Sequence, residues 1–559
     1  MRAMAADAPA ALSIAIGQLN PVVGDIAGNL EKARLAHEEG KALGADLLVL
    51  TELFLCGYSP EDLVLKPAVQ DACRAAAEEL AALTQEGPAI GIGAPWVDED
   101  GLHNSFLLLD GGKIAAIRHK VELPNYGVFD EVRVFKPGEL PGPVEFRGVR
   151  LGFPICEDLW LPDVTDTLAE TGAELLIVPN GSPYWQNKAE ERMQIAVARV
   201  VETALPLLYA NQVGGQDELV FDGASFGLNS DRTLAFQMPQ FHTGIALTRW
   251  ERGENGWRCV DGPNVELPER DCANWQACVL GLRDYVGKNG FKGVVLGLSG
   301  GIDSAICAAM AVDALGAERV RCIMLPYRYT SEESLKDAAD CARRLGVEYD
   351  ILPIAPAVEG FGEVLEPLFA NLPRDITEEN IQSRVRGTAL MAVSNKLGLM
   401  LVTTGNKSEV SVGYSTIYGD MNGGFNPVKD LYKTEVFRLA RFRNGERPSG
   451  CLGPEGEIIP VNIIDKPPTA ELRENQKDQD SLPPYEMLDA ILECLVEKEM
   501  RVSEIVALGH DRATVKKVEH LLYLAEYKRR QAAPGVKITM RNFGRDRRYP
   551  ITNRFRDDS

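Results

Sequence analysis

The sequence predicts an α/β protein, and three observations support this. From about residue 12 to residue 247, short apolar runs typical of strands alternate with alanine-rich helical stretches. A second region with the same character begins at Ala273. The polar segment 251–271 separates the two regions, and it is expected to be a linker because it has neither strand nor helix periodicity. A chain of 559 residues allows three or four domains of about 150 residues, or two larger α/β domains.

The first region is expected to begin with a strand. Residues 12–16 form an apolar run that lacks the pattern of a signal peptide. The same short apolar runs predict further strands at residues 47–50, 89–93, 105–109, 114–117, 175–178 and 207–210. The stretches between them predict helices, so this region is expected to be layered.

The second region is expected to begin with a helix from Ala273, followed by an apolar strand at 293–298 and an alanine-rich helix at 305–315. Residues 450–484 are rich in proline, glycine and charge, which predicts a mobile loop near a functional site. Two short helices and a basic tail are expected after this loop. We expect one domain at residues 1–262, ending in the linker, and a second at 263–559.

The chain is strongly acidic, with 59 Lys and Arg against 81 Asp and Glu and a net charge of −22. This argues against a protein devoted to nucleic acid or to an anionic membrane. The tail at residues 528–556 is the exception, because it carries ten basic residues and only one acidic residue. Such a tail is typical of an RNA-binding patch or of a subunit contact that neutralises an acidic surface, and the overall charge favours the second.

No apolar run approaches the roughly 20 residues that span a bilayer, so no transmembrane helix is expected. The eleven cysteines lack the paired short spacings of a zinc site or a disulfide framework. We expect them to be reduced, and the protein to be cytoplasmic.

A first group of reactive residues lies at the ends of predicted strands. Cys156 follows the run Leu151-Gly152-Phe153-Pro154-Ile155, where the chain must turn and present the thiol. A cysteine alone is more often a small buried apolar residue. Glu52 ends one strand and Lys120 follows another, so a carboxylate base and an ammonium group are available to it. A thiol, a base and a cation suit amide hydrolysis through a thioester.

These motifs resemble the carbon-nitrogen hydrolase, or nitrilase, superfamily across residues 12–247. The resemblance implies an αββα sandwich in which Glu52 is the base, Lys120 supports the oxyanion and Cys156 is the nucleophile. Glu131 matches the second, supporting glutamate of that superfamily, although its position alone equally suits a surface charge. The neighbouring sequences Thr51-Glu52-Leu53-Phe54 and Ile155-Cys156-Glu157-Asp158 look like those of glutaminase domains. In those domains glutamine is held at the positions matched by Tyr58, Tyr126, Ser182 and Lys188.

A second motif, Ser299-Gly300-Gly301-Ile302-Asp303-Ser304, lies between an apolar strand and a helix. Adjacent glycines let backbone N–H groups face a phosphate, and the helix N-terminus adds positive potential. Asp303 is placed to hold Mg²⁺ beside that phosphate. The motif lacks the Gly-Lys-Ser/Thr ending of a Walker A loop and resembles the loop of N-type ATP pyrophosphatases. Those enzymes include NAD, GMP, asparagine and argininosuccinate synthetases and tRNA thiolation enzymes.

Later motifs narrow this choice. Thr403-Thr404-Gly405-Asn406-Lys407-Ser408-Glu409 closes another apolar strand with a second carboxylate. Asn380 and Arg384 lie one helical turn apart, an arrangement suited to a phosphate or a carboxylate. Arg386 equally suits a solvated helix face or a ligand contact. The ordered series across about residues 273–500 closely resembles the family of glutamine-dependent NAD synthetases, and implies a doubly wound parallel-sheet domain with a Rossmann-like ATP pyrophosphatase fold.

That resemblance also implies ligand roles in the second domain. The residues implied to bind ATP are Ser299, Gly300, Gly301, Asp303, Ser304, Thr404 and Lys433. Asp303 and Glu409 would carry Mg²⁺, and Asn380, Arg384 and Asp420 would hold deamido-NAD. Residues 476–485 resemble the lid of the family, but Gln479 stands where an acidic residue is usual.

The resemblance therefore implies an enzyme that converts deamido-NAD to NAD, using ATP and ammonia released from glutamine. A protected passage for ammonia and a homo-oligomer built on a dimer of synthetase domains are implied by the resemblance. Two alternatives remain at this point. One is amidation of a different nucleotide acceptor by the same chemistry, and the other is a catalytically silent nucleotide-binding scaffold.

Overall fold

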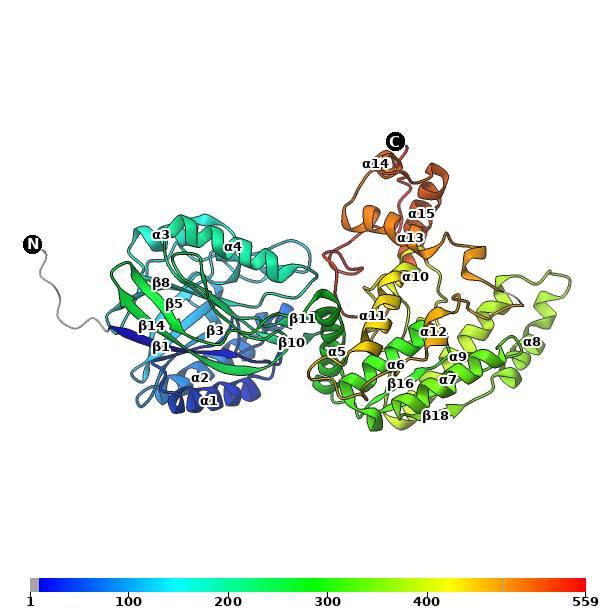
Figure 1. Cartoon of the computed structure of the whole chain (residues 1–559), viewed down its shortest axis with the longest axis horizontal. Coiled ribbons are helices and arrows are strands. Elements are labelled where there is room, and N and C mark those ends of the chain that lie inside the picture. The colour runs from blue at the N-terminus through cyan, green and yellow to red at the C-terminus, as the bar shows by residue number, and fades with distance from the viewer. Residues whose placement is uncertain (1–9, 475) are drawn as a thin grey trace, which may run out of the picture. The chain divides into compact units, whose positions relative to one another are not determined.

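The computed structural model describes residues 10–474 and 476–559. These residues form two compact units, one of residues 10–216 and 220–268, the other of residues 217–219 and 269–559 (Figure 1). None of the described helices is both long and apolar enough to cross a membrane. All eleven cysteines are free in the structure.

The first unit contains two large sheets. In spatial order, the first consists of β15 (Gly256–Asp261), β14 (Gly244–Gly253), β1 (Ala11–Gln18), β2 (Leu47–Val49), β3 (Ala89–Val97), β4 (Leu102–Asp110) and β5 (Lys113–His119). The second consists of β13 (Leu234–Gln237), β12 (Phe226–Leu228), β9 (Leu207–Asn211), β8 (Leu175–Asn180), β7 (Val149–Gly152) and β6 (Val144–Phe146). A separate pair is formed by β10 (Val213–Gln216) and β11 (Leu219–Asp222). The strands expected from the sequence are all present.

Helices cover the outer faces of these sheets, which gives the predicted αββα sandwich (Figure 1). The helices α1 (Ile26–Ala42) and α2 (Pro67–Leu83) pack on the first sheet, and α3 (Pro162–Glu170) and α4 (Lys188–Thr203) on the second. Fully buried side chains of both sheets, such as Ile14 from β1 and Leu208 from β9, form one core between them. The aligned sheets leave the strand ends free to carry polar groups.

The prediction of a linker at residues 251–271 is wrong over most of that segment. Residues up to 253 continue β14, and β15 pairs antiparallel with it, so that Arg252 lies opposite Trp257. Trp257 and Cys259 alternate with exposed residues, one of them Arg258, and are buried in the core between the sheets. This run of alternating buried and exposed residues is short and lies among charged residues, so the composition of the segment did not reveal the period of two that is typical of a strand. Only residues 262–269 lack regular structure before α5.

The second unit is built on a parallel sheet with the order β18-β17-β16-β19. Its strands are β16 (Val294–Gly297), β17 (Val320–Met324), β18 (Glu348–Ile351) and β19 (Met400–Leu401). One face is covered by α6 (Ile302–Leu315) and α7 (Glu332–Leu345), with α5 (Arg270–Lys288) behind α6. The other face is covered by α9 (Ile376–Leu397), which packs next to α8 (Ala355–Phe369). Helices on both faces of a parallel sheet confirm the doubly wound fold.

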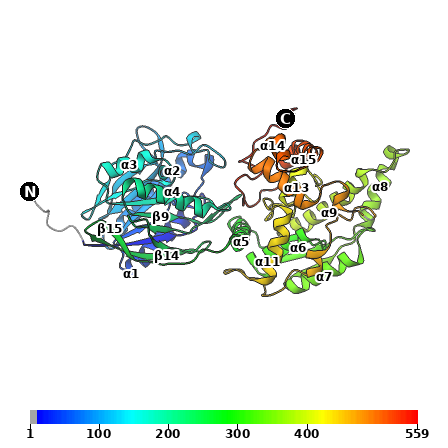
Figure 2. The ribbon, with the colours of Figure 1, turned by 45° about the horizontal axis from the view of Figure 1, so that its top comes forward.

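The remaining helices follow the sheet in the chain. They are α10 (Lys407–Val412), α11 (Lys433–Gly445), α12 (Val461–Asp465), α13 (Tyr485–Leu492), α14 (Val502–Ala507), α15 (Arg512–Leu524) and α16 (Glu526–Arg529). Helices α13, α14 and α15 lie together next to the C-terminus and share an apolar core with α10 (Figure 2). The structure therefore has more helices after residue 484 than the two short helices expected from the sequence. Gly509 and the helix-capping Asp511, whose carboxylate accepts from the Thr514 N–H at 2.8 Å, separate α14 from α15.

The basic tail is largely neutralised within the second unit. Arg529 and Arg547 both pair with Glu526, and Lys537 pairs with Asp546. Lys528 donates to the carbonyl groups of residues 413 and 415. These contacts agree with a neutralising role for part of the tail, while Arg545, Arg548 and Arg554 are exposed.

Candidate active site

The first candidate site lies where the strands of the first unit end. Glu52 follows β2, Lys120 directly follows β5, and Cys156 opens a 3-10 turn at Cys156–Leu159. Cys156 has a φ of 49°, in the left-handed region that costs a non-glycine residue energy. This conformation presents the thiol at the strand-to-helix turn, as its position in the sequence predicted.

The ammonium group of Lys120 is held between two buried carboxylates. Its Nζ donates to Glu52 Oε1 at 2.7 Å and to both carboxylate oxygens of Glu131, at 2.9 and 3.0 Å. Lys120 and Glu52 are fully buried. Burial alone would lower the pKa of Lys120, but the charges of Glu131 and Glu52 raise it well above its ordinary value. The lysine is therefore a permanent cation at neutral pH.

Cys156 is buried beside these charges. Burial, together with the negative charge of Glu52, raises the pKa of its thiol well above the ordinary value, although Lys120 opposes the shift. The resting side chain of Cys156 is therefore a thiol rather than a thiolate. A thiol needs a base in order to attack a carbon atom, and Glu52 is the carboxylate with the strongest effect on this one.

Asn104 is a member of this cluster that the sequence reasoning missed. Its amide nitrogen donates to Glu52 Oε1 at 2.8 Å and to Glu131 Oε2 at 3.3 Å. Its carbonyl oxygen on the main chain accepts from the Lys120 N–H at 2.8 Å. The available signal was a polar residue at the start of an apolar strand, β4, where its side chain is fully buried.

Asp158 connects the two segments that carry Lys120 and Cys156. Its carboxylate accepts from the main-chain N–H groups of Val121, Glu122 and Ile155 at 3.0, 2.7 and 2.9 Å. Burial raises its pKa to about 7. Since the neighbours of Lys120 and of Cys156 bond to one side chain, this carboxylate fixes their relative position.

The residues expected to hold glutamine surround this cluster. Tyr58 donates its hydroxyl to Glu131 Oε1 at 2.7 Å, and Tyr126 donates to Glu157 Oε1 at 3.0 Å. The Lys188 ammonium lies 3.8 Å from the ring centres of both Trp160 and Trp185. Burial, with the charge of Arg192, lowers the pKa of Lys188 to about 8.

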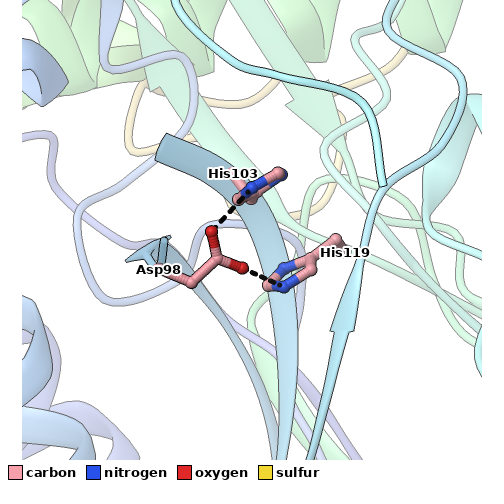
Figure 3. A group of neighbouring side chains, drawn as sticks. All are labelled: Asp98, His103 and His119. Carbon is pink, nitrogen blue, oxygen red and sulfur yellow. Dashed lines mark hydrogen bonds and ion pairs between the residues drawn. The ribbon is translucent and has the colours of Figure 1, made fainter. Parts of the chain in front are cut away.

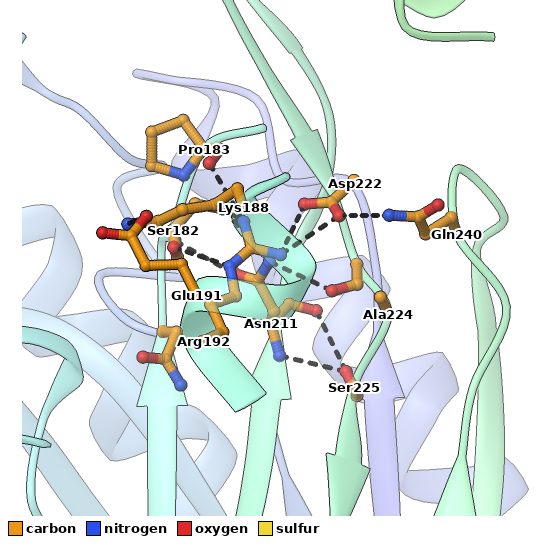
Figure 4. Close-up of polar contacts among 12 residues, drawn as sticks. Ser182, Pro183, Lys188, Glu191, Arg192, Asn211, Asp222, Ala224, Ser225 and Gln240 are labelled. Atoms are coloured by element: carbon orange, nitrogen blue, oxygen red, sulfur yellow. Dashed lines mark hydrogen bonds and ion pairs between the residues drawn. The ribbon is translucent and has the colours of Figure 1, made fainter. Parts of the chain in front are cut away.

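Arg192, also missed from the sequence, organises the loop that carries Ser182 (Figure 4). Its guanidinium donates to Ser182 Oγ at 3.0 Å and to the carbonyl groups of Ser182 and Pro183 at 2.8 and 3.0 Å. It also pairs with the buried Asp222 at 2.8 Å, and Gln240 donates to the same carboxylate. A charged arginine inside helix α4 was the only signal, and its partners lie on distant strands.

The second candidate site is a cavity of about 320 Å³ in the second unit. The predicted site residues that line it are Ser299, Gly301, Asp303, Ser304, Thr404, Glu409, Asp420 and Lys433. Residues 466–472 and Asp478 also line it, which confirms that the 450–484 segment lies near a site. Gly300 lies in the loop beside the cavity with a φ of 80°, and a Cβ atom there would meet the Ser334 carbonyl oxygen at 2.4 Å. Only glycine therefore fits this position.

The loop before α6 is closed by its own hydroxyl groups. Ser304 Oγ accepts from the Ser299 N–H at 3.2 Å and donates to the Gly301 carbonyl at 3.0 Å. Ser299 Oγ accepts from the Gly301 N–H at 3.2 Å. This turn thus lies at the N-terminus of α6, and the positive end of the helix dipole there favours an anion such as a phosphate.

Two carboxylates of this cavity converge on one cation. Lys433 pairs with both Asp303 and Glu409, the latter at 3.1 Å. Burial raises the pKa of Glu409 to about 8, against the effect of Lys433. These carboxylate oxygens, which lie around one positive charge, are ligands that suit a hard divalent cation such as Mg²⁺.

The other predicted ligand residues, two on α9 and one on the loop 413–424, lie close together but do not all reach the cavity. Thr416 joins two of them, because its hydroxyl donates to Asn380 Oδ1 at 3.0 Å and its N–H donates to Asp420 Oδ1. Arg384 donates to the Ile417 carbonyl at 3.2 Å. Asn380 and Arg384 are absent from the lining of the cavity, whereas Arg386 lines it. Burial lowers the pKa of Arg386 to about 10, and it remains charged at neutral pH.

Sequence comparisons assign each half of the chain to a protein family. The pattern of the carbon-nitrogen hydrolase family matches residues 13–253, and that of the NAD synthase family matches residues 274–532. The glutamine-dependent NAD(+) synthetase of Rhodobacter capsulatus is 56% identical over 549 residues, covering 98% of this chain and 99% of that protein. The enzyme of the same name from Thermotoga maritima is 42% identical, with 98% and 99% covered.

Solved structures agree with this assignment. The glutamine-dependent NAD+ synthetase from Acinetobacter baumannii, solved with ADP, is 40% identical and has a TM-score of 0.78, covering 98% of this chain and 100% of that one. A structure from Cytophaga hutchinsonii with 22% identity and a TM-score of 0.83 shares the fold, with 97% and 98% covered. With two domain patterns in this order and full-length relatives above 40% identity, the chain belongs to the family of glutamine-dependent NAD(+) synthetases.

Proposed function

We propose that this chain amidates deamido-NAD to NAD, with glutamine as the nitrogen donor and ATP cleaved to AMP and pyrophosphate. The single observation that carries the glutaminase half is the buried ammonium of Lys120 between Glu52 and Glu131, next to the thiol of Cys156. The full-length relatives carry the identity of the acceptor. The comparisons give no support to another acceptor or to a silent scaffold.

In the glutaminase reaction, Cys156 Sγ attacks the side-chain carboxamide carbon of glutamine. Glu52 accepts the thiol proton as the S–C bond forms and returns it to the departing nitrogen, which leaves as ammonia. The fixed charge of Lys120 lowers the energy of the oxyanion that forms in between. Water then hydrolyses the γ-glutamyl thioester, with Glu52 as the base, and glutamate is released.

The pocket residues position glutamine for this attack. We assign Tyr58, Tyr126, Ser182 and Lys188 to substrate binding, and Glu131 to support of the catalytic lysine. Tyr58 is tied to Glu131, while Ser182 is held by Arg192, so both are fixed before the substrate arrives. Such prior positioning lowers the entropy cost of binding.

In the synthetase reaction, a carboxylate oxygen of deamido-NAD attacks the α-phosphorus of ATP, and the bond to pyrophosphate breaks. Ammonia then attacks the adenylated carbonyl carbon, AMP leaves and NAD results. The loop Ser299–Ser304, Thr404 and Lys433 would hold ATP, because the loop lies at the N-terminus of α6 and lines the cavity together with Thr404 and the cationic Lys433. Asp420, with Asn380 and Arg384 on the same loop network, would hold deamido-NAD.

Asp303 and Glu409 would hold Mg²⁺, which, when bound, neutralises the charge of the phosphates and of the leaving pyrophosphate. Both carboxylates are partly buried and share the Lys433 ammonium, so the chain already places a positive charge between them. Lys433 therefore orients the two carboxylates, and its own charge adds to the attraction for phosphate.

We further propose a cytoplasmic homo-oligomer. The free thiols of all eleven cysteines fit a reducing compartment. Helix α8 has no buried residue in the described chain, and Phe361, Val364 and Leu368 on one of its faces are 52%, 74% and 74% exposed. A second copy of the synthetase domain is the occupant that fits a continuous apolar face of this kind.

The test follows all products at once. The enzyme is incubated with Mg²⁺, ATP and deamido-NAD, and either glutamine or ammonium is supplied. We expect NAD, AMP and pyrophosphate with either nitrogen source, and glutamate only with glutamine, each identified by mass. The absence of NAD in both reactions would contradict the proposed acceptor, and NAD from ammonium alone would contradict the glutaminase half.

A further inference from the structure

A cluster of two histidines and an aspartate lies at one edge of the first unit, apart from the groups used above (Figure 3). Asp98 directly follows β3, His103 lies in β4 and His119 ends β5. Asp98 Oδ1 is 3.2 Å from His103 Nε2, and Asp98 Oδ2 is 3.1 Å from His119 Nε2. The three ligand atoms all lie within 4.8 Å of one another.

The strand register explains this convergence. His119 pairs with Ser105 across β4 and β5, and His103 lies two residues before Ser105 on the same face. The two imidazole rings therefore stack, with their centres 4.2 Å apart. The cluster is a product of the antiparallel pairing and needs no unusual backbone.

The hydrogen bonds of His103 indicate that a cation belongs here. His103 Nδ1 lies 2.9 Å from the Lys136 carbonyl oxygen, which only accepts, so Nδ1 carries the proton. In the neutral ring, Nε2 then directs a lone pair at the carboxylate of Asp98, which also only accepts. Two acceptors face each other across 3.2 Å, and either a metal ion or a second proton on His103 must lie between them.

The surroundings favour the metal ion. His119 Nδ1 contacts Ser105 Oγ at 2.7 Å, which turns Nε2 of that ring towards Asp98. Asp98 Oδ1 accepts from the N–H groups of Asp100 and Gly101 at 2.9 and 3.2 Å, which fixes the carboxylate. A backbone carbonyl behind His103 and a hydroxyl behind His119 form the kind of arrangement that orients histidines at metal centres.

We propose that Asp98, His103 and His119 form a binding site for a divalent transition-metal ion of the zinc type. Two imidazole nitrogens and one carboxylate favour Zn²⁺, Co²⁺, Ni²⁺ or Cu²⁺ over Mg²⁺. Bonds of about 2.0–2.1 Å to a tetrahedral ion place the ligand atoms about 3.3 Å apart. Each histidine Nε2 lies at a similar distance from one of the two carboxylate oxygens of Asp98, and one oxygen with both nitrogens lies within 4.8 Å. The carboxylate side chain is 35% exposed, so an ion enters from solvent and water completes its coordination.

The site is joined to the glutaminase through the chain. His119 precedes Lys120, and Lys136, whose carbonyl holds His103, lies two residues before Gly138, whose N–H donates to the Lys120 carbonyl at 2.8 Å. A bound ion therefore ties together three strand ends around the catalytic lysine. It stabilises the folded first unit, because it binds the folded chain and not the separated residues of the unfolded one.

The experiment uses the full-length enzyme, stripped with a chelator and kept in excess Mg²⁺ so that the synthetase carboxylates are not counted. Co²⁺ is added as a spectroscopic probe, followed by Zn²⁺ as competitor, and thermal unfolding is measured with and without Zn²⁺. We expect one equivalent of Co²⁺ with visible d–d bands, no sulfur charge-transfer band, displacement by Zn²⁺, and a rise in Tm of the first unit.

Three separate variants, His103→Gln, His119→Gln and Asp98→Asn, should each weaken Co²⁺ binding at least about 10-fold and remove the Zn²⁺-dependent rise in Tm. The matched control is His520→Gln, an exposed histidine on α15, which should bind as the wild type does. The metal ions are tested at concentrations up to about 100 µM. The proposal is overturned if the wild-type enzyme binds neither Co²⁺ nor Zn²⁺ in that range. It is also overturned if all three variants keep the bound equivalent and its spectrum. The wild-type measurement decides the matter even if a variant fails to fold.

Discussion

The Lys120 ammonium lies 2.7 Å from Glu52 Oε1, and both side chains are fully buried. A buried ion pair of this kind is costly to form, and removing one partner leaves the other charge unpaired. Here the pair is completed by Glu131, Asn104 and the Gly181 N–H, which donates to Glu52 Oε2 at 2.8 Å. The carboxylate of Glu52 is thus held in one orientation beside a thiol whose pKa is raised by burial.

Replacing Cys156 separates the two nitrogen sources. Cys156→Ala removes the nucleophile and leaves the synthetase unit unchanged, so glutamine-dependent NAD formation should fall at least about 1,000-fold. NAD formation from ammonium should stay within about twofold of the wild type. The measurement is the rate of NAD production with each donor. As a control, Cys73→Ala, a buried cysteine of α2, should keep glutamine use; full glutamine-dependent turnover by Cys156→Ala would disprove the nucleophile.

Lys188 should make glutamine binding pH-dependent. Its pKa is lowered to about 8 by burial and by Arg192, so it is charged at pH 7 and about nine-tenths neutral at pH 9. If the charged form binds glutamine, the KM for glutamine should rise about 10-fold between pH 7 and pH 9. In Lys188→Gln, the KM should be high and show no such rise. Equal pH profiles for the two proteins would exclude this role.

Arg192 is expected to act through the loop that it holds. Arg192→Lys removes the planar guanidinium group that donates hydrogen bonds to Ser182 and Pro183, and it leaves the carboxylate of Asp222 poorly paired. We expect a KM for glutamine about 10-fold higher, with ammonium-dependent synthesis retained. Arg249→Lys, at an exposed position on β14, is the control and should leave the KM unchanged. A fall in both reactions together would indicate a general loss of folding instead.

Asp303 is expected to serve the synthetase reaction whatever the nitrogen source. Asp303→Asn removes one of the two carboxylates that converge in the cavity, so NAD formation should fall at least about 100-fold with glutamine and with ammonium. The dependence of the residual rate on Mg²⁺ concentration should shift to higher values. Asp350→Asn, on the edge strand β18, should behave as the wild type. Normal activity of Asp303→Asn at ordinary Mg²⁺ would refute the metal assignment.

The exposed face of α8 should control the oligomeric state. Leu368→Glu places a charge where the side chain is 74% exposed, and it should shift the mass measured by light scattering towards the monomer. Stability of the monomer should change little, because the residue has no buried contacts to lose. Leu508→Glu, at an exposed position after α14, is the matched control. An unchanged mass for Leu368→Glu would show that subunits associate elsewhere.

Most of the fold follows from the local pattern of residues. Apolar runs of strand length, interrupted by alanine-rich stretches, identified seven strands of the first unit (β1 to β5, β8 and β9) and β16 of the second, because burial on a sheet face acts on each short segment separately. The motifs around Glu52, Lys120, Cys156 and Asp303 were visible for the same reason: each is a short segment at the end of a strand. The hairpin of β14 and β15 was missed, since two buried side chains at alternate positions among charged residues give a weak signal.

The sequence alone determined which residues are able to react, and the tertiary structure decided which of them meet. Lys120 after β5 meets Glu52 after β2 only because the order of the strands brings together positions far apart in the chain. Arg386 reaches the cavity while Arg384, two residues earlier on the same helix, does not, since positions two apart on a helix point in different directions. Local sequence encodes periodicity and turn chemistry, but contacts between distant segments depend on strand order and register, which no short segment contains.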